Sequence, residues 1–191
     1  SILSDFQSTF GEYNTNRIEQ VGATVGDELV RQALIAIGLS WVLMIIYITV
    51  RFEIRFAIAA ILSLIIDVLM VISWFAFFHL EVDSSFVAAI LTVIGYSVNG
   101  TIVVFDRIRE NLKSHRPSES LTELVDSSIM QCMTRTLYTN FMVLFTVAAI
   151  LLFGGETIWN FTFAMFVGFS SGLYTSIFLA GPLWKLLKEK Y

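Results

Sequence analysis

The chain has 191 residues, of which 56% are hydrophobic and only 15% are charged. Because soluble domains carry about 25% charged residues, this composition argues against a water-soluble globular protein. Seventeen phenylalanines and four tryptophans against two prolines exclude a disordered chain. The formal net charge is −4, whereas nucleic-acid-binding proteins usually carry an excess of basic residues. No nucleic-acid partner is therefore expected. An integral membrane protein is the class that remains.

Five apolar stretches are long enough to cross a membrane as helices. A hydrocarbon core of about 30 Å requires roughly 20 mostly apolar residues. The predicted spans lie near residues 33–50, 56–80, 86–105, 137–153 and 158–184. These runs are continuous, whereas the strands of a membrane barrel alternate, so helices are favoured. The sequence therefore predicts an all-α membrane protein with a five-transmembrane-helix bundle within residues 27–191.

The basic residues predict the orientation of this bundle. Ten of the twelve lie in three segments that the spans place on one side, residues 51–55, 107–135 and 185–191. The opposite side holds only Arg17 and Arg31 beside eight acidic residues. The positive-inside rule then puts the N-terminus outside and the C-terminus in the cytosol.

The first 26 residues are expected to be a short remnant of an external domain. Weak apolar alternation that ends in the glycine-containing segment 22–26 predicts a last strand and a turn, with a disordered tail as the alternative. A helix is then expected to begin near Asp27 and Glu28, whose charges suit the positive end of a helix dipole. Because the chain begins with Ser1 rather than Met, we expect it to be part of a longer protein.

The segment between the third and fourth spans predicts an amphipathic cytosolic helix. Ser120 and Glu123 have the spacing of a capping box. Apolar residues follow at helical spacing: Leu121, Leu124, Val125, Ile129 and Cys132. We expect this helix to lie along the inner membrane surface and to lead into the fourth span, the alternative being a solvated linker.

Asp67 is the deepest charged residue in any predicted span. It lies eleven residues after Phe56, which at 1.5 Å per residue is roughly 17 Å into a core of about 30 Å. A charge at such depth costs about 2.5–3.5 kcal/mol on insertion scales, so these residues are usually functional or paired. Asp67 can load and release protons, or it can be a neutral carboxyl that binds a hydroxyl and locks two helices together. Both hypotheses stay open.

A polar stripe follows one side of the third span. It consists of Thr92, Gly95, Asn99 and Asp106, three of them spaced by seven residues. Because seven residues turn a helix almost twice, this side must face protein or water. A charged cytosolic motif comes next, in which we expect interfacial ion pairs: Arg107, Arg109 and Glu110.

Arg135 opens the fourth span and begins a second polar stripe with Thr139 and Thr146. Its planar guanidinium can hold a carboxylate with two hydrogen bonds, and Asp106 is the nearest candidate. The candidate ion-coupling residues are therefore Asp67, Asn99, Asp106 and Arg135. Three glycines are candidates for close helix packing, two of them in a small-xxx-small pattern of the fifth span: Gly95, Gly168 and Gly172.

Catalytic and metal-binding patterns do not occur in the sequence. His79, His115 and the single cysteine Cys132 lack the spacing of a metal site. The sequence has no nucleophile elbow, phosphate-binding loop or zinc signature. We therefore predict a protein that is not an enzyme and that needs no metal or cofactor.

Two neighbouring segments have a distinctive amino-acid sequence. They are AAILTVIGYSVN at residues 88–99 and TIVVFDRIREN at residues 101–111. They closely resemble the SecF signature of the SecD/SecF family of protein-export membrane proteins, within the resistance-nodulation-division superfamily. Supporting matches extend over residues 20–185, among them Asp67 as the second-span acid. The resemblance implies that a first helix and most of an external domain are missing here.

The resemblance also implies a function. It predicts an auxiliary subunit of the Sec machinery in a bacterial or archaeal cytoplasmic membrane, which uses the proton motive force to promote polypeptide translocation. The implied partners are SecD, the SecYEG translocon, YajC, YidC, the translocating polypeptide and membrane lipid. An exporter of a small or lipidic molecule and a scaffold that conducts no ions are the alternatives.

Gly100 departs from the family pattern, which typically has Asp at this position after the Asn of the signature. A glycine cannot titrate, so the proton site that the family implies cannot be transferred to it. Coupling would then use Asp67, Asp106 or a carboxylate of SecD, or a cation other than the proton, or be absent.

Overall fold

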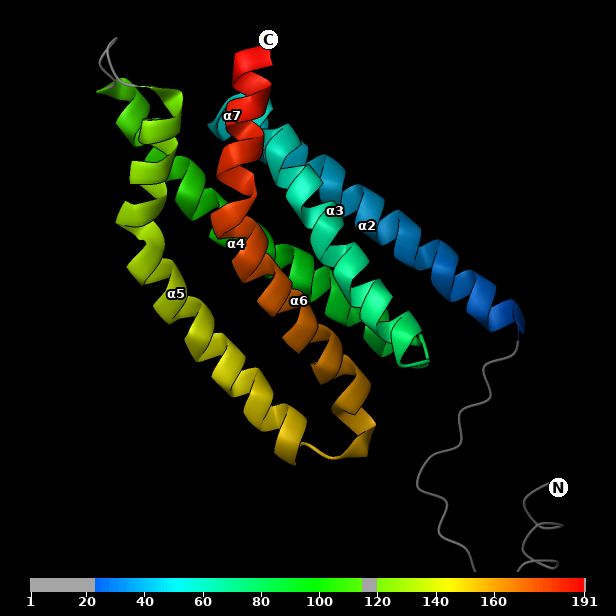
Figure 1. Ribbon diagram of the computed structural model, residues 1–191. Helices are drawn as coiled ribbons and strands as arrows, with labels where there is room; N and C mark the ends of the chain where they lie inside the picture. The colour runs from blue at the N-terminus through cyan, green and yellow to red at the C-terminus, as the bar shows by residue number, and fades with distance from the viewer. Residues whose placement is uncertain (1–22, 115–119, 191) are drawn as a thin grey trace, which may run out of the picture.

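The computed structural model describes residues 23–114 and 120–190 (Figure 1). The expected strand and the first residue of the expected turn, within residues 1–22, lie outside this part of the chain. The described elements are α2 (Ala23–Arg51), α3 (Ile54–Phe77), α4 (Ser84–Lys113), α5 (Leu121–Phe153), the 3-10 turn η1 (Glu156–Ile158), α6 (Trp159–Phe178) and α7 (Ala180–Lys190).

Five of the segments are long and apolar enough to cross a membrane, as predicted. They are Val30–Arg51, Ile54–Phe77, Ser84–Lys113, Leu121–Phe153 and Glu156–Phe178. No strand occurs within the described ranges. The all-α, five-span architecture is thereby confirmed.

One helix begins earlier than expected, and one begins where the sequence predicts. Helix α2 begins at Ala23, not near Asp27. A single glycine such as Gly26 costs a helix only about 1 kcal/mol, which the cooperativity of a long helix absorbs. Helix α5 begins at Leu121, directly after the N-cap Ser120 of the predicted capping box. The Ser120 amide donates to the Glu123 carboxylate (3.0 Å), and the Glu123 amide donates to Ser120 Oγ (3.2 Å). The amphipathic helix and the fourth span form this one continuous helix.

The predicted fifth span, residues 158–184, is broken at Leu179 into α6 and α7. Pro182 explains the break, because its ring nitrogen cannot donate to the carbonyl of Phe178 and its ring crowds that carbonyl. The amides of Leu179 and Leu183 keep their bonds to Thr175 and Leu179, at 3.0 and 2.9 Å. The chain can therefore change direction at the end of α6.

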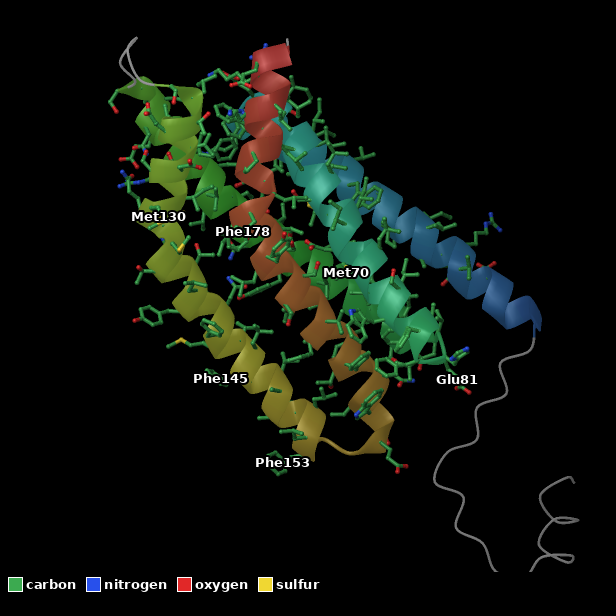
Figure 2. All side chains as sticks on the ribbon, in the orientation of Figure 1. Met70, Glu81, Met130, Phe145, Phe153 and Phe178 are labelled. Carbon is green, nitrogen blue, oxygen red and sulfur yellow. The ribbon has the colours of Figure 1, made fainter. Side chains whose placement is uncertain are left out.

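Helices α4 and α6 cross at the centre of the bundle and make its most extensive contact (Figure 1). Helix α3 packs on both of them, whereas α2 and α5 lie at the edges. Ile48 is the one fully buried side chain described in α2. Figure 2 shows Phe145 and Phe153 on the outer side of α5, where 74% and 87% of their surface is exposed. In a membrane these outer sides face lipid or another protein.

Aromatic packing fixes α7 to the bundle. The ring of Trp184 stacks on Phe56 of α3 with centroids 4.7 Å apart, and Phe105 of α4 meets Phe56 edge-on at 4.9 Å. Trp184 and Phe105 expose none of their surface. This cluster closes the end of the bundle at which the α2–α3 turn and the C-terminus lie (Figure 1).

Close helix packing involves two of the three predicted glycines. A Cβ at Gly168 of α6 would overlap the side chain of Val93 in α4, and one at Gly172 would lie 2.9 Å from Ser97 Oγ. The prediction does not hold for Gly95, because a Cβ there would meet nothing within 4 Å among the described residues. Gly95 lies on the exposed side of α4, away from α6.

We expect Gly168→Ala to lower the free energy of unfolding by about 1–3 kcal/mol, because the added methyl group must displace Val93. Gly95→Ala is the matched control and should be neutral or slightly stabilising, since it adds helix propensity in open space. Unfolding of the purified protein in detergent by increasing SDS measures both. Equal stability of the two variants would contradict close α4–α6 packing.

Candidate functional site

Asp67 lies at the meeting point of three helices and exposes none of its surface. Three hydroxyl groups donate to its carboxyl group. Ser171 Oγ of α6 donates to Oδ1 at 2.7 Å, and Thr175 Oγ1 lies 2.9 Å from Oδ1 and 3.1 Å from Oδ2. Ser97 Oγ of α4 donates to Oδ2. We refer to these four residues as the Asp67 cluster.

The local sequence of α6 places its two hydroxyls together. Ser171 and Thr175 are four residues apart, so they lie one above the other on the same side of the helix. Gly172 is next to them and lacks a side chain, which leaves room for Ser97 to approach from α4. The small-residue pattern of α6 therefore does more than pack helices, because it brings a donor of α4 within reach of Asp67.

The Asp67 cluster can satisfy two protonation states. If the carboxyl is ionised, all three hydroxyls donate to it; if it is protonated, it donates its own hydrogen to one hydroxyl oxygen, because a hydroxyl group also accepts. Within residues 23–114 and 120–190, no Lys, Arg or His forms an ion pair with Asp67. No group of three His, Cys, Asp or Glu side chains gathers into a metal site in the same ranges.

The hydroxyls around Asp67 were not singled out from the sequence as site residues. The helix-locking hypothesis required a hydroxyl partner but did not identify it. A usable signal existed, since Gly168, Ser171, Gly172 and Thr175 share one side of α6. Ser97 could not be found this way, because its role depends on how α4 crosses α6.

The other three coupling candidates lie apart from Asp67. Asn99 and Asp106 are exposed on the side of α4 that also carries Thr92 and Gly95, so the predicted stripe faces away from the core of the described chain. Arg135 of α5 is exposed on this same open side and lines a cavity with Asn99. The structure thus brings Asn99 and Arg135 together and separates both from Asp67.

Asp106 and Arg135 line a second cavity of about 290 Å³, next to the end of α2. The ion pair that Asp106 forms there is with Arg51, at 4.0 Å. Arg135 forms no ion pair with any residue that the structure describes. The expected bidentate contact between Arg135 and Asp106 is therefore not present in this conformation.

The charged motif at the end of α4 joins α4 to α5. Arg107 forms the expected ion pair with Glu110 at 2.5 Å, and its Nε donates to Gln131 of α5 at 2.5 Å. Arg109 lies over the ring of Phe52, 5.5 Å from the centroid, and so contacts the α2–α3 turn instead. The motif holds helix ends together and does not contact Asp67.

Comparison with known proteins decides the family. Residues 2–190 match the family model of the protein export membrane protein SecD/SecF, C-terminal. The chain belongs to this family. Its five-span bundle with the crossed α4 and α6 is thus the membrane part of a SecD/SecF-type protein.

Similar proteins extend well beyond the present chain. The protein translocase subunit SecF of Acidaminococcus fermentans is 62% identical over 99% of this chain and 64% of its own length. The SecDF subunit of Bacillus subtilis is 43% identical over 99% of this chain and 26% of its own length. A crystal structure of SecDF from Thermus thermophilus, described as a translocon-associated membrane protein, has a TM-score of 0.82 and 38% identity, over 88% of this chain and 23% of that one.

We expect Thr175→Val to destabilise the bundle by about 1–2 kcal/mol, because it removes the hydroxyl that reaches both carboxyl oxygens and leaves the side-chain shape intact. Thr146→Val is the control, since that hydroxyl is exposed and donates only to Met142 of its own helix. SDS unfolding compares the two. An equal decrease in the free energy of unfolding in both variants would show that the hydroxyl of Thr175 contributes no more to stability than an exposed one.

Proposed function

We propose that the chain is the membrane part of a SecF-type auxiliary subunit of the Sec export machinery, which acts with SecD and is not an enzyme. The names of its relatives and the translocon-associated description of the Thermus structure support this proposal. In this function the protein uses an ion gradient to promote translocation of a polypeptide beside the SecYEG channel. YajC and YidC are further proposed partners.

The observation that carries the proposed ion coupling is the Asp67 cluster. A carboxyl that is fully buried and surrounded by hydroxyls, with no counter-charge among the described residues, can change charge without losing its hydrogen-bond partners. One proton that moves down a potential of 100 mV releases about 2.3 kcal/mol. Coupling requires a group that changes charge along the path, and Asp67 is such a group.

Ionisation of Asp67 can move helices because charged acceptors bind hydroxyls about twice as strongly as neutral ones. The ionised form pulls Ser97 of α4 and both hydroxyls of α6 towards α3. The protonated form weakens these bonds and allows the helices to separate. Since Asp67 exposes no surface, a proton can reach it only when the helices move, which ties proton exchange to a change of conformation.

The open polar side of the bundle supports a membrane partner. The α4 stripe and Arg135 are exposed in the described chain, and lipid does not tolerate such groups without partners. We propose that SecD covers this side. We also propose that the N-terminus is outside a bacterial or archaeal cytoplasmic membrane and the C-terminus is in the cytosol, on the basis of the loop charges.

We expect Asp67→Asn to abolish the stimulation of export by the ion gradient, because asparagine cannot titrate but keeps the size and hydrogen bonding of the side chain. Export of a precursor into inverted membrane vesicles, with and without an imposed gradient, measures this. Asp126→Asn makes the same change at an exposed position of α5 and should keep full stimulation. Copurification of SecD with each variant tests assembly.

Full gradient stimulation in the Asp67→Asn variant would place the coupling site elsewhere and leave Asp67 as a lock between helices. Loss of SecD binding in that variant would show that Asp67 acts through assembly. Loss of stimulation with assembly intact supports the proposal.

The orientation can be tested at the two ends of α4. Ser84 is the first residue of this helix, Ser114 directly follows its last residue, and both are exposed. In a Cys132→Ser background, we expect a membrane-impermeant maleimide to label Ser84→Cys from outside the cell and Ser114→Cys only in inverted vesicles. Labelling of both from one side would overturn the orientation and the charge argument behind it.

A further inference from the structure

A cavity of about 370 Å³ lies between the α2–α3 turn and the last turns of α4. We call it the Arg109 cavity, and it has no role in the function proposed above. The candidate spans Val30–Arg51 and Ser84–Lys113 end beside it, and Ile54–Phe77 begins there. Because all three spans begin or end at this level, the cavity lies where lipid head groups meet the bundle.

The charge in the wall of the Arg109 cavity is predominantly positive. The wall has three cations and one carboxylate, which are Arg51, Arg109, Lys113 and Glu53. The carboxylate lies 3.9 Å from Arg55, and Arg51 pairs with Asp106 at 4.0 Å. Arg109 and Lys113 form no ion pair with any residue that the structure describes. The cavity therefore offers two cationic side chains for an anionic ligand.

The ring of Phe52 positions the two arginines beside the cavity. The guanidinium carbon of Arg51 lies 5.6 Å from the ring centroid, and that of Arg109 lies 5.5 Å from it. Cation–π attraction restrains both side chains and leaves their N–H groups able to donate at the edge of the guanidinium plane. Lys113 follows Arg109 by four residues, on the same side of α4. The cations thus come together before any ligand binds.

Apolar side chains line the same cavity. Val50 belongs to the last turn of α2 and Phe56 to the first turn of α3, so both lie on the hydrocarbon side of the charged turn. Phe56 exposes only 1% of its surface and stacks on Trp184. A free inorganic anion would use the cationic wall alone, whereas an amphiphilic anion uses both parts of the wall.

We propose that the Arg109 cavity binds the head group of an anionic glycerophospholipid of the phosphatidylglycerol class. Arg109 donates two parallel hydrogen bonds to the phosphodiester, and Lys113 adds a point charge. The glycerol backbone packs on Val50 and Phe56. Basic pockets between transmembrane helices at the cytoplasmic surface bind anionic head groups, and the orientation proposed above puts this cavity in the cytosolic leaflet.

The size of the Arg109 cavity suits this ligand. At about 30 Å³ for each water-sized group, a volume of about 370 Å³ holds roughly twelve of them, enough for a phosphodiester and one glycerol. A helix, which is about 10 Å wide with its side chains, does not enter such a cavity. A zwitterionic phospholipid brings its own cation, which Arg109 and Lys113 repel.

Native mass spectrometry of the delipidated full-length protein, with the SecD partner that copurifies with it, tests the proposal. Dioleoylphosphatidylglycerol and dioleoylphosphatidylcholine are titrated separately. We expect saturable binding of phosphatidylglycerol with an affinity at least about 10-fold higher than that of phosphatidylcholine, since each cation contributes about 1 kcal/mol. Combined Arg109→Gln and Lys113→Gln substitutions should abolish this preference. Combined Lys185→Gln and Lys188→Gln substitutions remove the same charge outside the cavity wall and should keep it.

A single substitution at an exposed position guards against a folding defect in the double variant. Lys113 is exposed on the last turn of α4, so Lys113→Gln leaves the packing of the bundle unchanged. We expect it to weaken phosphatidylglycerol binding by about 5-fold. Excess glycerol 3-phosphate, which carries the anionic group without acyl chains, should not displace the lipid.

Four results would overturn the proposal. Equal affinity for the two lipids would deny a preference for an anionic head group, and undiminished binding in the Lys113→Gln variant would place the lipid elsewhere. An equal loss in the Lys185→Gln and Lys188→Gln control would indicate general attraction to positive charge. Displacement by glycerol 3-phosphate would indicate a site for a free phosphate. None of these measurements depends on export, so failure of the coupling proposal at Asp67 leaves the test intact.

Discussion

The hydrogen bonding of one buried carboxyl group constrains how the helices of this bundle pack. Asp67 has no access to solvent and no basic partner among the described residues, so its oxygens depend on hydroxyls from neighbouring helices. Those hydroxyls reach it only if α4 and α6 cross closely beside α3. Gly172 permits that approach, because any side chain there would collide with Ser97. The buried carboxyl group of α3 thus obtains its hydrogen-bond donors because α6 has a glycine where α4 must come close.

Helix α4 separates two polar regions of opposite character. Ser97 and Asn99 are two residues apart, and two residues turn a helix by about 200°, so their side chains lie on opposite sides. Ser97 faces an acidic region, the Asp67 cluster, while Asn99 faces the region of Arg135. A buried carboxyl group and a guanidinium group therefore lie on the two sides of one helix.

Several features of the site follow from particular residues in the sequence. The depth of Asp67 follows from its distance to Phe56, and the capping box of α5 follows from the spacing of Ser120 and Glu123. Other features do not follow. Gly95 and Gly168 look equivalent in the sequence, yet one faces open space and the other touches Val93, because contact depends on which side of α4 meets α6. The hydroxyl partners of Asp67 depend on the same crossing.

The sequence by itself determined the membrane class, the all-α architecture with five spans and the buried acid, because hydropathy and helical period are local properties that any sufficiently long apolar run expresses. Only the tertiary structure decided which hydroxyls donate to Asp67, that Asp106 pairs with Arg51, and that Arg135 lines a cavity with Asn99. These contacts join residues up to 108 positions apart. They are set by how side chains of different helices interlock, and no local pattern records that.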